Sequence, residues 1–229
     1  MSDISLHYTQ YGAGAPLLLL HGNGEDHTYF TPQMAPLGAH RTVYALDTRG
    51  HGRSPRGSAP FTIGQFAEDV GTFMDEHGLE KADLLGFSDG GNIALTFALA
   101  HPDRVSRLVL NGANLAPAGV EPAVQLPIIA GHALASLFAK RCPRARRKAE
   151  LLDLMVSQPQ IDPAALGALT MPVLVIAGSR DMIRLSHTLL IARSLPNSRL
   201  KLLDGDHFIA AKRPEAFSQA VLEFLLDQA

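Results

Sequence analysis

The sequence contains a single cysteine, no tryptophan and no long uninterrupted apolar run. Because Cys142 has no second cysteine to pair with, an internal disulfide is excluded, and we expect a reducing, cytoplasmic location. Residues 1–12 show no basic start followed by an apolar run, so we expect no signal or transit peptide. The longest apolar stretch, residues 124–139, is interrupted by polar positions and is too short to span a bilayer comfortably. We interpret it as a buried or half-buried lid.

Charge is also sparse. Charged residues make up 18% of the 229 residues, and the formal net charge is -2. Such a chain has no general field that would recruit nucleic acid or an anionic membrane, so we expect a small-molecule substrate and neither of those partners. Apolar residues make up 46%, which is enough to bury a large core, and the length suits one domain.

Strand and helix patterns alternate along the chain. Short β-branched and leucine-rich runs predict buried strands at residues 16–20, 42–46, 82–87, 107–110, 172–177 and 199–203, after a first strand at 4–10. Apolar spacing predicts a helix over residues 63–74, with Thr62 and Gln65 as a possible capping box and Gly78 after its end. A second helix is predicted from Pro214 onward.

This alternation predicts the α/β class, with a mostly parallel sheet covered by helices on both faces and functional loops at the carboxyl ends of the strands. The strand rhythm stops over residues 114–170, where proline, alanine, leucine and basic residues dominate. We interpret this segment as a lid insertion within a single domain, residues 1–229.

Residues 86–90 read Gly-Phe-Ser-Asp-Gly, directly after a predicted strand and before a helical run. This is the G-x-S-x-G pattern in its expected strand, turn and helix context. The serine of such a turn sits on a strained backbone, and side chains two residues to either side would collide with the crossing chain. The pattern therefore predicts Ser88 as a nucleophile.

A serine hydroxyl is a weak nucleophile, so it needs a base and a third group that orients the base. Asp181 follows the strand predicted at 172–177, and His207 follows the next one, in the order Ser, Asp, His. Two rival acids are less suitable: the loop at 111–114 offers only amides, and Asp206 is adjacent to His207, where neighbouring side chains diverge. We predict His207 as general base and Asp181 as its orienter.

Acyl transfer also requires donors for the tetrahedral oxyanion, and backbone N–H groups can supply them. The N–H of Asp89, at the start of a helix, is one predicted donor. The N–H of Asn23, in the loop after the first parallel strand, is the other. This chemistry implies no metal and no organic cofactor.

Together these motifs resemble those of the α/β-hydrolase superfamily over residues 6–226, and the resemblance implies that fold with a short helical lid. The elbow is similar to that of valacyclovir hydrolase-like esterases, in which the acid after the nucleophile recognises the α-amino group of amino-acid esters. The resemblance implies substrate binding by Asp89 and Phe87, with His51 at the entrance. Two structural interpretations stay open: Asp89 complements the positive end of a helix, and residues 47–54 form a loop buttressed by Arg49.

A dense basic segment lies within the predicted lid, at Lys140, Arg141, Arg144, Arg146, Arg147 and Lys148. It is interpreted as a solvated helical face, with attraction of an anionic substrate tail as the alternative. For the reaction we expect hydrolysis of a small carboxylic ester, or of a related thioester or amide-like bond, through an acyl-enzyme. The same residues serve C–C bond hydrolysis, lactone opening and peracid formation, and a ligand-sensing receptor is the remaining alternative.

Overall fold

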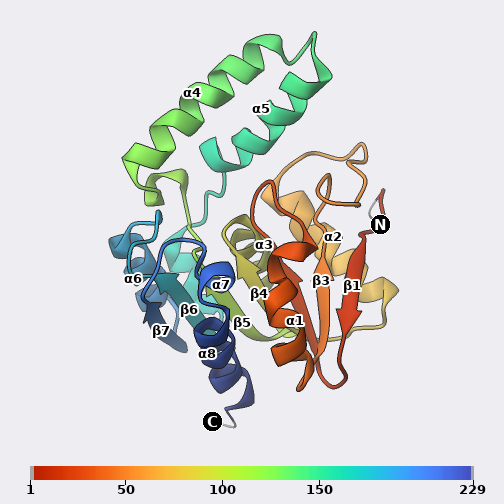
Figure 1. Ribbon diagram of the computed structural model, residues 1–229, viewed down its shortest axis with the longest axis vertical. Coiled ribbons are helices and arrows are strands. Elements are labelled where there is room, and N and C mark those ends of the chain that lie inside the picture. The colour runs from red at the N-terminus through yellow and green to blue at the C-terminus, as the bar shows by residue number, and fades with distance from the viewer. Residues whose placement is uncertain (1–2, 228–229) are drawn as a thin grey trace.

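A computed structural model describes residues 3–227 and shows a sheet with helices on both faces (Figure 1). The strand order is β1-β3-β2-β4-β5-β6-β7, and only β1 runs antiparallel to its neighbour. The strands are β1 (Tyr8–Tyr11), β2 (Pro16–Leu20), β3 (Thr42–Leu46), β4 (Ala82–Phe87), β5 (Val105–Asn111), β6 (Val173–Gly178) and β7 (Ser198–Leu203). The α/β-hydrolase fold predicted from the sequence is therefore confirmed.

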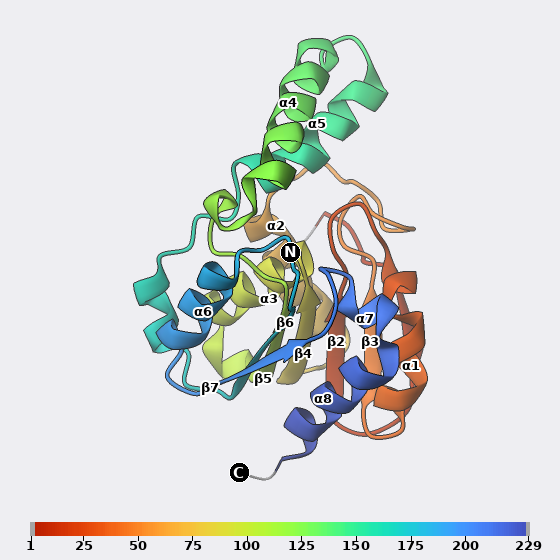
Figure 2. The ribbon, with the colours of Figure 1, turned by 60° about the vertical axis from the view of Figure 1, so that its left-hand side comes forward.

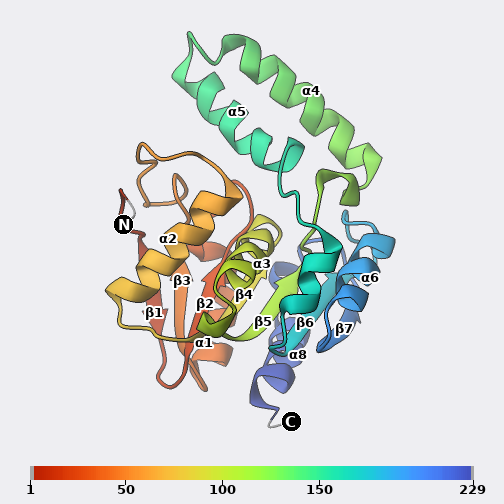
Figure 3. The same ribbon diagram turned by 180° about the vertical axis from the view of Figure 1, so that it is seen from behind.

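Two helical layers enclose the sheet (Figures 1 and 3). One apolar cluster joins the sheet to α2 (Ile63–Glu76), α3 (Asp89–Ala100) and α6 (Leu185–Ser194). The opposite cluster joins it to α1 (Thr31–Gly38), α7 (Ile209–Lys212) and α8 (Pro214–Leu226). The strands β2 and β4 are neighbours, but the chain continues from β2 to β3 on one side of them and from β4 to β5 on the other. The loops after β2 and β4 therefore meet at this change of direction, the switch point where open α/β sheets bind their ligands.

Several local predictions can be checked directly. The strands lie within two residues of their predicted bounds, except that β1 begins at Tyr8. The Thr62 hydroxyl accepts a hydrogen bond from the Gln65 N–H at 3.1 Å, which confirms the N-cap of α2. The Gln65 side chain does not complete a capping box, because it donates to Asp69 instead. The apolar face of α8 is buried as predicted.

The loop after β3 is fixed from beneath by Arg49. This side chain is fully buried and forms two hydrogen bonds of 2.7 Å with the Asp69 carboxylate of α2. It also pairs with Asp3 at 2.7 Å. Bidentate pairing of this kind gives the guanidinium a defined orientation. The buttressing role that the sequence suggested for Arg49 is confirmed.

The segment predicted to be a lid contains a helical hairpin of α4 (Pro122–Phe138) and α5 (Pro143–Val156), which stands above the carboxyl edge of the sheet (Figures 1 and 2). Within α4 only Gln125 and Ala135 are buried, and Leu134 and Leu137 are 61% and 77% exposed. Of the expectation that residues 124–139 are buried or half-buried, full burial was therefore wrong, and only part of the helix is half-buried. The apolar run packs along α5 but not against the sheet, which leaves its other side in solvent. Within residues 3–227, no helix combines the length and apolar character needed to cross a bilayer.

Candidate active site

Ser88 lies on a tight turn between β4 and α3. Its φ is 53°, the single positive φ among the described residues other than glycine. A Cβ on Gly86 would stand 2.2 Å from the Gly90 carbonyl oxygen, and one on Gly90 would stand 2.0 Å from that of Leu20. Only glycine fits these two positions, as the sequence pattern required. The Ser88 N–H donates to the Asn111 carbonyl oxygen at 2.8 Å, which ties the turn to the end of β5.

His207 and Asp181 meet at the same edge, from the loops after β7 and β6. His207 Nδ1–H donates to Asp181 Oδ1 at 2.7 Å, and the exposed fractions of the two side chains are 4% and 3%. Asp181 Oδ1 also accepts the Ile183 N–H at 2.9 Å, which fixes the carboxylate. His207 Nε2 is buried and has no hydrogen-bond partner within residues 3–227. A neutral imidazole held in this tautomer presents a basic lone pair at Nε2.

The remaining neighbours of His207 leave little freedom for its ring. A Cβ on Gly112 would stand 2.7 Å from His207 Cε1, so the backbone after β5 packs closely against the imidazole. The Phe87 ring also packs against the imidazole of His207, and the two ring centroids are 4.8 Å apart. Asp206, the rival acid, turns away and pairs with Lys212. Asp181 is thus the carboxylate that contacts His207.

The two predicted oxyanion donors lie on the loops after β2 and β4. Neither the Asn23 N–H nor the Asp89 N–H donates a hydrogen bond to another group of residues 3–227. The Asn23 side chain donates to the Leu151 carbonyl oxygen of α5 at 2.6 Å, so this loop also contacts the lid. Open N–H groups at the switch point are suited to receive an anionic oxygen.

His21 holds the loop after β2 in place. Its Nε2 accepts the Thr48 N–H at 3.0 Å, so its Nδ1 carries the proton and donates to the Gly22 carbonyl oxygen at 2.7 Å. Burial, with the neighbouring His51, lowers the pKa of His21 to about 4. The ring is therefore neutral near pH 7 and acts as a structural bridge.

The Asp89 carboxylate is 7% exposed and faces side-chain amides. Its Oδ1 accepts from Asn92 Nδ2 at 3.3 Å, and Asn92 Nδ2 also donates to Asn114 at 3.0 Å. Asp89 Oδ2 is buried without a hydrogen-bond partner in the described chain. Burial raises the pKa of this carboxyl to about 6, against the opposing effect of amide hydrogen bonds.

Phe87 and His51, which the resemblance placed in substrate binding, are both buried. Phe87 is 1% exposed and stacks on Tyr29, with ring centroids 4.3 Å apart. His51 is 4% exposed and lies in a ring cluster with His21 and Phe61. Phe87 therefore supports His207 from below, and His51 supports the loop after β3.

Glu25 was not found by sequence reasoning. Its Oε2 accepts the Gly22 N–H at 3.1 Å, directly beside the predicted oxyanion loop. Burial raises the pKa of Glu25 to about 7, although the Gly22 N–H and the nearby His207 oppose the shift. The neighbouring Tyr29 hydroxyl is buried without a partner in residues 3–227. The only signal in the sequence was the position of Glu25, three residues after Gly22.

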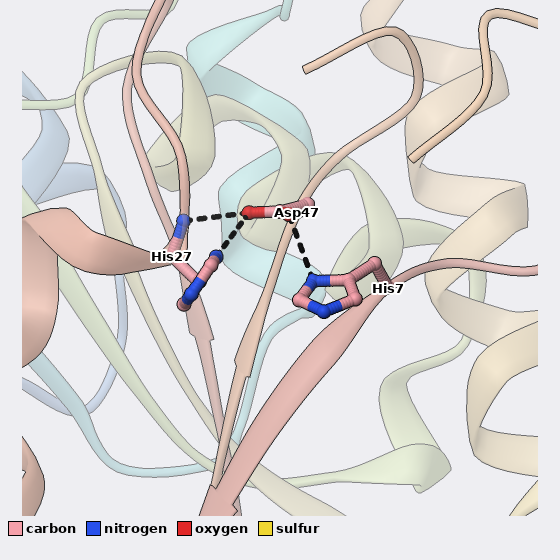
Figure 4. A group of neighbouring side chains, drawn as sticks. All are labelled: His7, His27 and Asp47. Atoms are coloured by element: carbon pink, nitrogen blue, oxygen red, sulfur yellow. Dashed lines mark hydrogen bonds and ion pairs between the residues drawn. The ribbon is translucent and has the colours of Figure 1, made fainter. Parts of the chain in front are cut away.

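A second histidine and aspartate cluster is formed by His7, His27 and Asp47 (Figure 4). In the described chain, His7, His27 and Asp47 are the one group whose ligand atoms, all within 4.8 Å of one another, could hold a metal ion. Asp47 already accepts four hydrogen bonds, from His7 Nδ1, His27 Nδ1, the His27 N–H and the Arg53 N–H, at 2.7 to 2.9 Å. With both Nδ1 atoms protonated, these four donors occupy the lone-pair sites of the carboxylate.

A serine on a tight strand-to-helix turn, an oriented histidine and open N–H groups thus lie at the switch point of an α/β sheet, the arrangement expected of α/β hydrolases. The chain belongs to the α/β hydrolase fold family, which matches residues 15–141.

Individual relatives are similar along nearly the whole chain. "Putative carbamate hydrolase RutD" of Caulobacter sp. (strain K31) is 32% identical over 93% of this chain and 91% of its own. Among solved structures, a hydrolase from Pseudomonas aeruginosa PA01 is 28% identical, with a TM-score of 0.80 over 97% of this chain and 98% of that one. The enol-lactonase from Burkholderia xenovorans LB400 is 26% identical, with a TM-score of 0.81 over 98% and 97%.

Proposed function

We propose that this protein hydrolyses a carboxylic ester of a small molecule through an acyl-enzyme formed on Ser88. The observation that carries the proposal is the state of His207: Nδ1–H is held by Asp181 at 2.7 Å, while Nε2 is buried and unpartnered in the described chain. A base with one nitrogen oriented and the other open is the arrangement that activates a neighbouring serine.

The mechanism follows from these positions. Ser88 Oγ attacks the carbonyl carbon, and its proton passes to His207 Nε2, while Asp181 stabilises the imidazolium. The N–H groups of Asn23 and Asp89 donate to the tetrahedral oxyanion. His207 then returns the proton to the departing alkoxide. A water molecule attacks the acyl-enzyme by the same route and releases the acid and free Ser88.

The class of acyl bond is the finer part of the proposal. The Caulobacter relative is named for carbamates and the Burkholderia structure for an enol-lactone, and both groups present a carbonyl to a nucleophile as an ester does. A panel of matched ester, lactone and carbamate substrates, compared by kcat/KM, ranks these bonds directly. We expect the simple ester to be turned over; activity on the lactone or carbamate alone would replace the ester assignment.

The central experiment measures turnover of p-nitrophenyl acetate. Ser88→Ala is expected to lower kcat by about 10⁴-fold or more, because the nucleophile and base act as a unit. Ser136→Ala, which removes a serine from the exposed side of α4, is the control and should leave kcat unchanged. Mass spectrometry of the quenched wild type should detect an acetyl group on Ser88. Full activity in Ser88→Ala would overturn the proposal.

A further inference from the structure

A cavity of about 480 Å³ lies between lid helix α5 and the loop that follows β3. The body contributes Arg56, Phe61 and the backbone of three glycines, and the lid contributes Arg146, Arg147 and Glu150. The volume is within the range of sites that hold small organic molecules. None of these residues belongs to the catalytic group described above.

The charge lining this cavity is predominantly positive. Its one acid, Glu150, is neutralised by Arg56 through contacts of 2.9 and 3.3 Å. Arg147 donates to the Gly50 carbonyl oxygen at 3.1 Å, a contact that fixes the guanidinium without compensating its charge. Arg146 forms no ion pair within residues 3–227. Two guanidinium charges therefore face the cavity without an acidic partner.

The helix geometry separates these arginines from the other basic residues of the lid. Pro143 and Glu150 each lie three or four residues from both Arg146 and Arg147 along α5, so the four residues share the face that turns to the body. The side chains of all four basic residues, Arg144, Arg146, Arg147 and Lys148, are exposed, but Arg144 and Lys148 do not line the cavity. The basic segment thus contains two arginines that line the cavity, Arg146 and Arg147, and other basic residues that do not.

Phe61 gives the cavity an apolar wall. The Arg56 guanidinium carbon lies 4.8 Å from the centroid of the Phe61 ring, and Arg56 also donates to the Ala59 carbonyl oxygen at 2.7 Å. This stacking holds the aromatic ring and the guanidinium together at one end of the cavity. A ligand that fits such a wall has a planar or apolar body as well as a charged group.

We propose that this cavity binds a small organic anion, with a phosphate or carboxylate group beside Arg146 and Arg147 and an apolar body against Phe61. Guanidinium groups form strong, charge-assisted hydrogen bonds to both kinds of anion. Because the arginines belong to the lid and Phe61 to the body, the bound anion fastens α5 to the loop after β3. The binding does not depend on the proposed ester hydrolysis. The anion is either the tail of a substrate or a separate effector.

Titration calorimetry with phenyl phosphate at constant ionic strength tests the site. The double variant Arg146→Gln, Arg147→Gln should weaken binding by about tenfold or more. The matched control Arg144→Gln, Lys148→Gln removes the same charge from the same helix and should change Kd by less than about twofold, because neither side chain lines the cavity and charges away from the ligand are screened by salt. Equal weakening in both variants, or no saturable binding to the wild type, overturns the proposal. Thermal unfolding verifies that both variants fold.

Kinetics with two matched esters then identify the source of the anion. If it is a substrate tail, the Arg146→Gln, Arg147→Gln variant loses kcat/KM for p-nitrophenyl hemisuccinate but not for neutral p-nitrophenyl butyrate, and phenyl phosphate competes with the charged ester. If it is an effector, phenyl phosphate binds without competing, and both esters respond alike. Either result supports the site, and calorimetry alone still decides its existence if neither ester is turned over.

Discussion

Two histidine and aspartate clusters lie at the same edge of this protein, and their chemistry differs. Asp181 and His207 are joined at 2.7 Å, and Asp47 joins His27 at 2.7 Å and His7 at 2.9 Å. Asp47 is saturated by four donors, and its two histidine side chains are 20% and 27% exposed (Figure 4). His207 is 4% exposed and keeps Nε2 free of any partner in the described chain. The His207 imidazole is therefore enclosed with one nitrogen open, whereas the Asp47 carboxylate is filled by its donors.

The largest expected effect separates the two clusters by activity. His207→Ala should lower kcat/KM for p-nitrophenyl acetate by about 10⁴-fold, because it removes the base of the unit that contains Ser88. His27→Ala removes a histidine with the same kind of partner and should lower kcat/KM by less than about tenfold. Steady-state kinetics on both variants make the comparison. Similar losses in the two would mean that the Asp47 cluster takes part in the chemistry.

A second substitution tests the clusters by stability. Asp47→Asn should reduce the free energy of unfolding by about 3 kcal/mol, because an amide cannot accept four hydrogen bonds in a buried position. Urea unfolding, with Asp204→Asn as an exposed control, measures this loss. Burial opposes ionisation of Asp47, but hydrogen bonds from Arg53 and His27 hold its pKa below the usual value. Its contribution is therefore present above about pH 4 and lost as pH falls through the lowered pKa, so the variant should lack that share of acid sensitivity.

The pH dependence of stability expected from Glu25 has the opposite sign to that expected from Asp47. Burial raises the pKa of Glu25 in the folded protein to about 7. At pH values between the lower pKa of the unfolded chain and pH 7, the folded protein therefore keeps a proton that the unfolded chain releases. The wild type should lose stability as pH rises through this range, and Glu25→Gln should not. The difference in Tm between variant and wild type is expected to be more positive at pH 8 than at pH 5. Glu76→Gln, on the exposed side of α2, is the control; a constant difference would show that Glu25 does not titrate in this way.

The smallest expected effect concerns Asp89. Its carboxylate is 7% exposed and contacts Asn92, so Asp89→Asn should lower kcat/KM for an α-amino ester and for its des-amino analogue by the same small factor. This outcome corresponds to the structural interpretation of the residue, in which its charge complements the start of α3. A loss confined to the amino ester would instead support recognition of a substrate ammonium by Asp89.

The sequence predicted those features whose cause is local. The cap at Thr62, the glycines around Ser88 and the alternation of strands and helices each depend on a few adjacent residues. The sequence order of Ser88, Asp181 and His207 predicted one shared site, because the carboxyl ends of parallel strands lie at one edge of the sheet.

Features that depend on distant contacts were not predictable in this way. The Asp47 cluster joins residues 20 and 40 positions apart, and the pKa of Glu25 depends on packing that no spacing reveals. Hydrophobicity identified residues 124–139 as apolar but could not tell that the hairpin stands away from the sheet. Leu137, exposed by 77%, shows that composition alone does not determine burial.

The positive φ of Ser88 also limits which side chains this turn can carry. Threonine has the same hydroxyl, but its branched Cβ is poorly compatible with a left-handed backbone. Cysteine has an unbranched side chain, so it meets the same backbone demand as serine and differs only in its sulfur. The turn thus restricts which residue can replace Ser88: cysteine is compatible with its backbone, whereas threonine is poorly compatible.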